Sequence, residues 1–242
     1  MSSLINKLDL LVKDTRMSFM MNEWDDGNDP FSIIVGQFFG KGDSIRIIDL
    51  SGMPNEIAGA VSSAIARILF SVKIWQTDEE RKKSPILLVC EEAHRYVPDV
   101  GEAQYEAAKD AIRRIAKEGR KYGIGLMLVS QRPSEIEATV LSQCSSWIVL
   151  RMTNDVDRER VRSILPDSLS GLTKMLSGLR RREALFVGLA AQLPSRILMS
   201  ALDPEILPQS QDIDFKSGWS SEPIDNDTIN NIGERWRQQI HL

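Results

Sequence analysis

The stretch that decides the fold is Ile86-Leu-Leu-Val-Cys-Glu-Glu-Ala-His94, in which five apolar residues end at two adjacent carboxylates. Such a run is typical of a buried strand in a parallel sheet, with Glu91 and Glu92 at its carboxyl end. In open α/β sheets, ligands bind at the carboxyl ends of the strands. Two acids there suit a Mg²⁺ ion with its water shell and the orientation of a water that attacks a nucleotide phosphate. The stretch therefore predicts a nucleotide-hydrolysis strand.

Composition sets the broad class of the protein. The 242 residues can bury the core of one large domain or two small ones, and 42% hydrophobic with 26% charged residues is typical of soluble globular proteins. With a net charge of −4, any contact with nucleic acid has to come from local basic patches. Cys90 and Cys144 are predicted to be buried free thiols in a reducing compartment. No signal peptide is visible and no apolar run approaches the roughly 18 residues of a membrane span, so we expect a cytoplasmic protein without membrane contact.

Aliphatic runs alternate with helical patterns along the chain, which predicts a mostly parallel, layered α/β sheet. The predicted strands are 31–39, 45–50, 86–90, 124–130, 146–151, 183–189 and 196–199. The predicted helices are 1–22, 56–75, 103–122, a short helix to 141, 155–164, 168–176 and 228–240. From residue 203 onward the chain is polar and contains prolines. Residues 1–202 are therefore predicted to form the main domain, and 203–242 a tail that docks on a neighbouring subunit or is mobile.

Polar side chains end three of the predicted strands: Glu91 with Glu92, then Gln131, and Asp49 near the end of 45–50. A solvated strand end would explain the two glutamates taken alone. Three polar strand ends at one edge of a sheet instead favour a binding or catalytic site. The chain has only one histidine besides His94, so no zinc or histidine cluster is expected. His94 is predicted to couple the strand end to a neighbouring loop or to segments on the DNA side.

The amphipathic helix 103–122 carries a basic face, and Gly123 is predicted to end it as a left-handed C-cap. The basic side chains are Arg113, Arg114, Lys117, Arg120 and Lys121. For Arg113, Lys117 and Lys121 a solvated helix face is the favoured interpretation. Farther along, Arg180-Arg-Arg182 fits either a contact with DNA phosphates or an exposed turn before a strand.

Four segments together resemble the HerA/FtsK class of hexameric DNA-translocating ATPases. Residues 86–94 are similar to the Walker B segment of that class, and residues 114–134 are more similar still, with Gln131-Arg-Pro-Ser134 the most discriminating tract. Residues 47–54 and 151–154 resemble flanking HerA segments. The resemblance covers roughly residues 1–200. It implies the C-terminal part of a RecA-like, three-layer, parallel-sheet ATPase core that uses ATP and Mg²⁺.

The resemblance also implies roles for five residues. Glu91 would hold the Mg²⁺ shell, Glu92 would polarise the hydrolytic water, and Gln131 would sense the γ-phosphate of ATP. Arg120 would act as an arginine finger across a subunit boundary, with Arg114 as the second candidate. Such a finger is worth a factor of ~10³–10⁵ in rate. Glu91 departs from the aspartate found in many nucleotidases, and its longer side chain would hold the metal a little differently.

The sequence contains no phosphate-binding loop of the form GxxxxGK[ST]. The nearest glycines, in residues 36–42, have the wrong spacing, no Ser or Thr directly after the lysine, and no helix behind them. In HerA-like proteins this loop and its strand lie upstream, and the strand would pair between 124–130 and 146–151. We expect an upstream segment of a longer polypeptide, or a separate chain, to supply it. Closure of the gap by the neighbouring strands is the third alternative.

The function implied by the resemblance is an ATP-dependent duplex-DNA translocase or helicase subunit. It would work in a homo-oligomeric, hexameric ring with ATP sites at the subunit interfaces, and the chain alone would be inactive. A NurA-type nuclease or a defence effector would be its partner in DNA end processing or phage defence. The alternative is a non-hydrolytic module for ring assembly or nuclease docking, in which the acids are relics.

Overall fold

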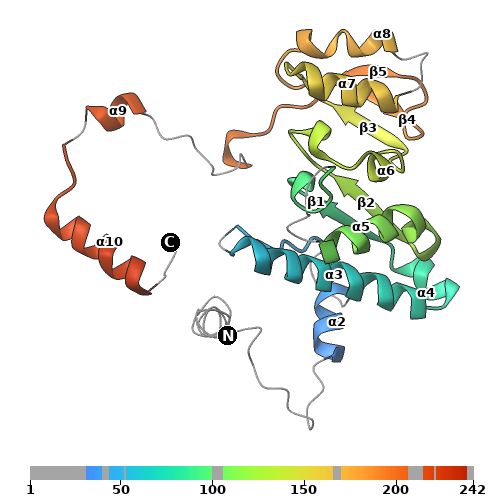
Figure 1. Cartoon of the computed structure of the whole chain (residues 1–242), viewed down its shortest axis with the longest axis horizontal. Helices are drawn as coiled ribbons and strands as arrows, with labels where there is room; N and C mark the ends of the chain where they lie inside the picture. The colour runs from blue at the N-terminus through green and yellow to red at the C-terminus, as the bar shows by residue number, and fades with distance from the viewer. Residues whose placement is uncertain are drawn as a thin grey trace, which may run out of the picture. The chain divides into compact units, whose positions relative to one another are not determined.

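The computed structural model describes residues 31–39, 44–51, 53–99, 106–165, 170–206, 215–220 and 222–238 (Figure 1). The residues from Asn28 to Ala201 form one compact unit, and the residues from Leu202 onward belong to a second. The predicted helix 1–22 lies outside the described residues.

Two parallel strands form the first sheet of the larger unit. β1 (Ile86–Cys90) pairs with β2 (Ile124–Leu128) in parallel, from Ile86 opposite Ile124 to Cys90 opposite Leu128. Parallel neighbours need a crossover, which α5 (Glu106–Glu118) and the 3-10 helix η3 (Gly119–Tyr122) provide. Gly123, with φ of 75°, ends this helical stretch in the left-handed conformation, as predicted.

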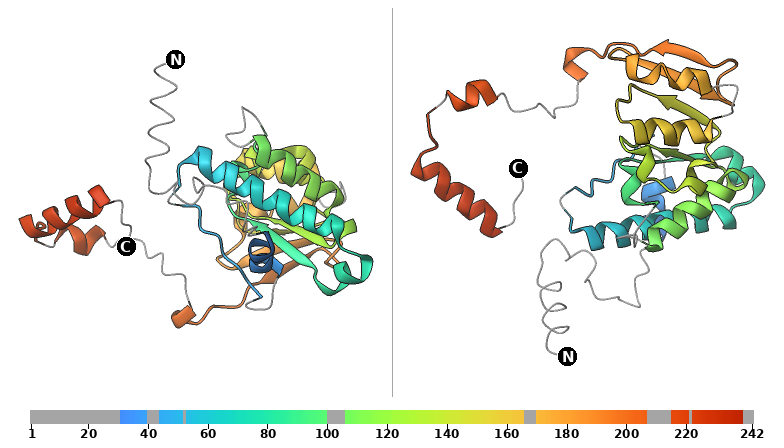
Figure 2. Two further views of the ribbon diagram at one scale, coloured as in Figure 1. Left: turned by 90° about the horizontal axis from the view of Figure 1, so that it is seen from below. Right: turned by 45° about the horizontal axis from the view of Figure 1, so that its top comes forward.

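Helices α3 (Asn55–Trp75) and α5 pack together on one side of this sheet (Figure 2). The core between them and β2 contains the buried residues Ala66, Phe70, Ile115 and Ile124. α4 (Asp78–Lys83) begins at a capping box of Thr77 and Glu80 and turns the chain back into β1.

Helix α3 contains a longer apolar run than was expected from the sequence. Among the described helices, it is the one whose residues Ile57–Trp75 are long and apolar enough to cross a membrane, by length and composition alone. Arg67 and Lys73 are the two charged residues within this run.

On the opposite side of the parallel sheet, apolar side chains are exposed because no described residues cover them. Leu87 is 59% exposed, Val89 47% and Met127 44%. They alternate with the residues that face α3 and α5, as the period of two in a strand requires. In the described part of the chain, the mixed α/β class with a parallel sheet is confirmed, and the helical layer covers one face of that sheet.

Three antiparallel strands form the second sheet. β3 (Ser146–Val149) pairs with β4 (Glu183–Gly188), and β4 pairs with β5 (Ser195–Leu198). The mostly parallel arrangement expected from the sequence does not extend to these strands. Between β4 and β5 the connection 189–194 is too short for a crossover, so these two strands pair antiparallel. The described strands thus comprise one parallel pair and two antiparallel pairs.

Helix α7 (Asp155–Ile164) covers this second sheet. Its Val161 joins Val149 and Leu185 in a buried cluster. The short elements around it are α6 (Ala138–Leu141), α8 (Ser170–Thr173), and the 3-10 helices η4 (Pro133–Glu135) and η6 (Leu176–Gly178).

No backbone ladder joins β2 to β3 in the part of the chain that the structure describes. The two strands lie in two separate sheets. The two sheets meet instead through side chains, since Trp147 packs against the clusters of both.

Two predicted strands are wrong. Residues 31–39 form the helix α2 (Phe31–Phe39), because a short apolar run does not by itself distinguish helix from strand. Residues 45–50 have no regular structure, and Ile45 and Ile47 are 79% and 88% exposed. In the described residues this segment has no neighbouring strand with which to pair.

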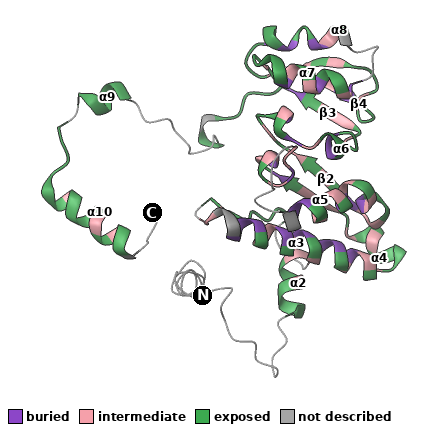
Figure 3. Ribbon diagram, in the orientation of Figure 1, coloured by how far each residue is buried: buried purple, intermediate pink, exposed green. Residues whose placement is uncertain are grey.

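The second unit contains the 3-10 helix η7 (Pro204–Ile206), α9 (Phe215–Trp219) and α10 (Asn226–Gln238). α10 agrees with the predicted helix 228–240 to within two residues at each end. Its side chains and those of α9 are mostly exposed, including Trp219 and Trp236 (Figure 3).

Candidate functional site

The parallel pairing brings the ends of β1 and β2 to one edge of the sheet. Beyond the last paired residues, Val129 N donates to Cys90 O at 2.9 Å and Ala93 N donates to Val129 O at 3.0 Å. The chain therefore leaves both strands side by side, with Glu91 and Glu92 after one and Gln131 after the other. This is the adjacency that the sequence predicted for the glutamates and the glutamine.

Glu92 has an unusual backbone. Its φ and ψ are both 49°, in the left-handed region, and it precedes the 3-10 helix η2 (Ala93–Arg95). A non-glycine residue in this conformation costs roughly 1–2 kcal/mol, and such strain concentrates at functional sites. Glu91 beside it is exposed and makes no side-chain hydrogen bond or ion pair within the described residues.

His94 connects the two strand ends. Its Nδ1 lies 3.3 Å from Glu92 Oε2 and 3.4 Å from Ser130 Oγ, which belongs to the loop after β2. Ser130 Oγ also accepts a hydrogen bond from Arg132 N at 3.0 Å. The prediction that His94 couples the strand end to a neighbouring loop is confirmed at the level of these contacts.

Gln131 is exposed, and within the described part of the chain its side chain makes no hydrogen bond. It is thus available to a ligand at this edge. Asp49 does not end a strand as predicted, because the segment around it has no regular structure. A backbone hydrogen bond from Ser51 N, at 2.9 Å to Asp49 Oδ1, lowers the pKa of this carboxyl.

The two candidate fingers differ in their surroundings. Arg114 lies on α5, its guanidinium stacks 4.6 Å from the centre of the Phe70 ring, and its Nε is 3.9 Å from Glu118 Oε2. Arg120 lies in η3, is exposed, and its guanidinium has no partner among the described residues. Arg120 therefore precedes β2 while Gln131 follows it, so the two residues lie at opposite ends of the same strand.

The donor set at the strand ends fits a Mg²⁺ ion that is shared with a nucleotide. In the described ranges, no group of three or more His, Cys, Asp or Glu side chains could hold a metal by itself. Mg²⁺ is usually bound by one or two carboxylates together with waters and substrate phosphates. The exposed carboxylate of Glu91 is of this kind, so a dedicated protein cage is not required.

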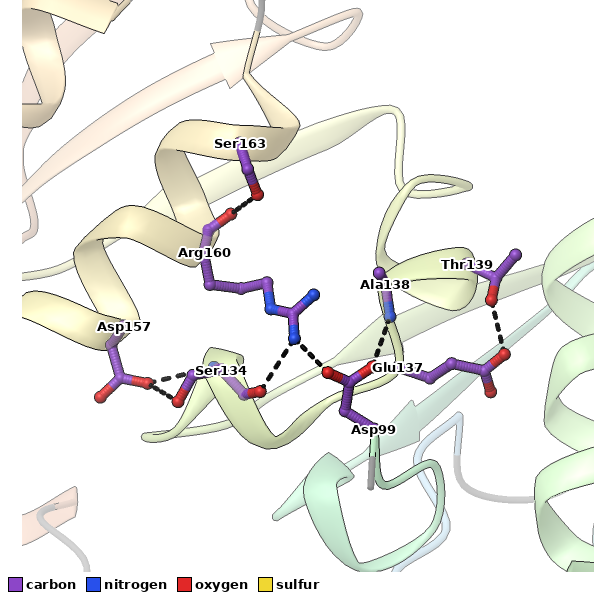
Figure 4. Close-up of polar contacts among 8 residues, drawn as sticks. All are labelled: Asp99, Ser134, Glu137, Ala138, Thr139, Asp157, Arg160 and Ser163. Carbon is purple, nitrogen blue, oxygen red and sulfur yellow. Dashed lines mark hydrogen bonds and ion pairs between the residues drawn. The ribbon is translucent and has the colours of Figure 1, made fainter. Parts of the chain in front are cut away.

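Sequence reasoning missed a group of buried and half-buried polar residues beside the site. Asp157 is 5% exposed, and its Oδ1 accepts hydrogen bonds from Ser134 N and Ser134 Oγ at 3.1 and 2.6 Å (Figure 4). Arg160 donates to Ser134 O at 3.2 Å and forms an ion pair with Asp99. The only signal in the sequence was the position of Asp157 in the first turn of a predicted helix, where an acid is ordinary.

Comparison with known proteins finds helicases. The chain is 30% identical to a probable helicase of Methanocaldococcus jannaschii over 187 aligned residues. The alignment covers 76% of this chain and 36% of that protein. It is 39% identical over 145 residues to the probable DNA double-strand break repair helicase HerA of the same organism, covering 60% of this chain and 28% of that one. With the HerA of Pyrococcus furiosus the identity is 40% over 116 residues, or 47% of this chain and 20% of the relative. No protein-family model matches the chain.

The chain is therefore homologous to HerA-type helicases, as its motifs predicted, and it spans between a fifth and two fifths of the length of these relatives. Among solved structures, it is similar to the genome packaging NTPase B204 from Sulfolobus turreted icosahedral virus 2 in complex with ATP-gammaS. That similarity has a TM-score of 0.45 and 14% identity, over 64% of this chain and 66% of the other.

Proposed function

We propose that this chain is the ATP-hydrolysing part of a HerA-type helicase that translocates duplex DNA as a ring. The observation that carries the proposal is the common edge of β1 and β2, from which Glu92 and Gln131 both emerge. Support also comes from the relatives, two of which are named as DNA double-strand break repair helicases.

In this proposal each residue at the edge has its own role in ATP hydrolysis. Glu91 would hold Mg²⁺, which neutralises charge on the nucleotide phosphates when it is bound. Glu92 would orient and polarise the attacking water, and Gln131 would contact the γ-phosphate. The contact with His94 supports a fixed orientation for the Glu92 side chain.

Arg120 would act on the ATP of a neighbouring subunit. β2 has five residues, so at ~3.3 Å per residue it is about 16 Å long. A guanidinium at the start of this strand cannot reach a phosphate at the end of the same strand, but it can reach one held by another subunit. This separation supports a homo-oligomer with sites at its interfaces, and the hexameric ring is the form that the HerA resemblance implies.

The phosphate-binding loop would come from outside the described residues. β2 and β3 share no hydrogen bonds, which leaves a backbone edge on each that another strand can pair with. We propose that an upstream segment of a longer polypeptide or a separate chain supplies a strand and a GxxxxGK[ST] loop at this place. A nuclease of NurA type or a defence effector is the partner proposed for the assembled ring.

The test is ATP hydrolysis by the assembly of this chain with the phosphate-loop segment. Phosphate release should require Mg²⁺ and increase with linear duplex DNA, and Glu92→Gln should reduce it at least ~10²-fold because the water loses its base. Glu79→Gln, an exposed glutamate of α4, is the matched control and should hydrolyse ATP normally. Full activity of the Glu92→Gln assembly would contradict the proposal.

The absence of a GxxxxGK[ST] loop from the sequence favours one alternative, a non-hydrolytic module for ring assembly or nuclease docking. The same experiment separates the two functions. If the assembly with the phosphate-loop segment releases no phosphate above background, while the chain still forms rings or binds the nuclease, the module is the better description.

A further inference from the structure

The loop that carries Gln131 is held by its neighbours and not by Gln131 itself. On one side, Ser130 Oγ contacts His94 Nδ1 at 3.4 Å and accepts from Arg132 N. On the other side, Ser134 donates two hydrogen bonds to the buried carboxylate of Asp157. Gln131 lies between these two anchors, so its position depends on both.

Asp157 holds Ser134 through two hydrogen bonds. One carboxylate oxygen accepts the backbone N–H and the hydroxyl of the same serine, at 3.1 and 2.6 Å (Figure 4). Hydrogen bonds to an ionised acceptor are roughly twice as strong as neutral ones. Both the backbone and the side chain of Ser134 are thereby fixed against α7.

Arg160, three residues after Asp157 on α7, connects the loops that follow both strands of the candidate site. Its Nη2 donates to Ser134 O at 3.2 Å in the loop after β2. The same nitrogen forms an ion pair with Asp99 in the segment after β1. Asp99 N also donates to Glu135 O at 2.8 Å, so the two loops are joined directly as well.

α7 also has an apolar anchor besides this polar network. α7 is already anchored on the second sheet by Val161, which is 1% exposed in the cluster with Val149 and Leu185. The network instead connects α7 with the loops of the other sheet. Because β2 and β3 are not hydrogen-bonded to each other, the orientation of these loops relative to the second sheet depends on such side-chain contacts.

We propose that Asp157 and Arg160 are positioning residues of the ATPase site, which hold the loop of Gln131 so that the glutamine meets the nucleotide in a single orientation. The inference rests on the proposed function and deepens it. A displacement of about 1 Å at the reacting groups can cost about 10²-fold in rate. Removal of the Asp157 or the Arg160 side chain should therefore lower kcat and leave the KM for ATP almost unchanged.

The experiment is a double-mutant cycle on kcat, in the assembly that hydrolyses ATP. Asp157→Ala and Gln131→Ala should each lower kcat by roughly 10–100-fold. If Asp157 acts through Gln131, the double variant should be no slower than Gln131→Ala alone. Arg162→Ala is the control, because Arg162 lies on the same helix, is exposed and pairs with Glu159; its kcat should stay within about twofold of the parent.

Multiplied losses in the double variant would overturn the inference, because Asp157 would then act on kcat independently of Gln131. If Asp157→Ala does not fold, Ser134→Ala replaces it in the double-mutant cycle with Gln131→Ala. Ser134→Ala removes the hydrogen bond from the hydroxyl to Asp157, and the two possible outcomes are the same. Failure of the proposed function looks different, since Glu92→Gln would then hydrolyse ATP normally. An inactive Glu92→Gln with multiplied losses for Asp157 and Gln131 overturns the positioning role alone.

Discussion

Glu92 Oε2 lies 3.3 Å from His94 Nδ1, although the two residues are separated by a single alanine. The left-handed backbone of Glu92, with φ of 49°, turns the chain sharply after β1 and begins the 3-10 helix that contains His94. Glycine would adopt this conformation at lower cost, but it has no carboxylate. The strained glutamate is therefore explained if its side chain is needed at this edge.

Replacement of Glu92 by glycine should separate stability from activity. Glu92→Gly relieves backbone strain of roughly 1–2 kcal/mol, and the greater freedom of glycine in the unfolded chain offsets about half of the gain. We expect the free energy of unfolding in urea to rise by up to ~1 kcal/mol, while ATP hydrolysis by the assembly is lost.

Arg182 is the matched control, because it is the other described non-glycine residue with positive φ, at 68°. Arg182→Gly should be stabilised by a similar amount, without loss of the ATP hydrolysis that is measured in the absence of DNA. If Arg182→Gly is more stable than the parent and Glu92→Gly is less stable, then the contact with His94 outweighs the strain, and our explanation of the glutamate is wrong.

The two candidate fingers should respond in opposite ways to truncation. Arg114→Ala removes the contact with the Phe70 ring, so it should cost about 0.5–1 kcal/mol of stability and little activity. Arg120→Ala should change stability by less than ~0.5 kcal/mol and reduce ATP hydrolysis by about 10³-fold or more. Thermal unfolding and phosphate release, measured on both variants, check the pair.

Mixing subunits tests whether Arg120 acts across an interface. Arg120→Ala and Glu92→Gln are each expected to be inactive alone, but mixed assemblies contain some interfaces with an intact Glu92 on one side and an intact Arg120 on the other. Hydrolysis should therefore reappear on mixing. Activity that stays at the level of the separate variants would argue that both residues serve the same subunit.

Gly119 permits the close approach of η3 to the start of β2. A Cβ at this position would lie 2.8 Å from the backbone oxygen of Ile124, so the turn that carries Arg120 would have to move. Gly119→Ala should lower the free energy of unfolding by roughly 1–3 kcal/mol. Gly178→Ala is the control, with no atom within 4 Å of its Cβ, and should be nearly neutral in the same urea titration.

The ion pair of Arg113 with Glu137 should make stability depend on acid pH. Arg113 Nε lies 2.7 Å from Glu137 Oε2. Burial acts to raise the pKa of Glu137, but the hydrogen bonds from Arg113 and Thr139 outweigh it and lower the pKa. The stabilisation is therefore present above the ordinary glutamate value of about 4.3 and is lost as the pH falls through the lower, folded-state value.

Relative to Glu137→Gln, the parent should be more stable by about 1 kcal/mol at pH 7, and this advantage should shrink as the pH falls below about 4. Urea unfolding of both proteins, from pH 7 down to about pH 2, measures the difference. In an Arg113→Ala background the difference should be small at every pH. An advantage that is independent of pH would mean that the charge of Glu137 does not stabilise the fold.

Thiol reactivity gives a further check of the buried strand. Burial raises the pKa of Cys90 to about 11, so very little thiolate is present near neutral pH. Cys90 should resist alkylation in the folded protein at pH 8 and react rapidly in urea. Fast labelling of the native protein at Cys90 would contradict the packing of β1.

The sequence by itself determined the features that depend on neighbouring residues. The aliphatic runs of β1 and β2, their polar ends and the cap at Gly123 follow from local pattern, because strand periodicity and a left-handed cap need no distant partner. Once these two strands were predicted to be parallel, the common edge for Glu92 and Gln131 followed as well. Local pattern failed at 31–39 and 45–50, where the same apolar residues fit a helix, a paired strand or an unpaired segment.

Only the tertiary structure decided which distant residues meet. Asp99 and Arg160 are 61 residues apart in the chain, and Ser134 and Asp157 are 23 apart. Their contacts depend on how the second sheet and α7 pack against the loops of the first, which no local pattern encodes. The antiparallel direction of β3, β4 and β5 and the stacking of Arg114 on Phe70 have the same origin. Such contacts form only after the layers have packed, and they decide which predicted residues remain free for a ligand.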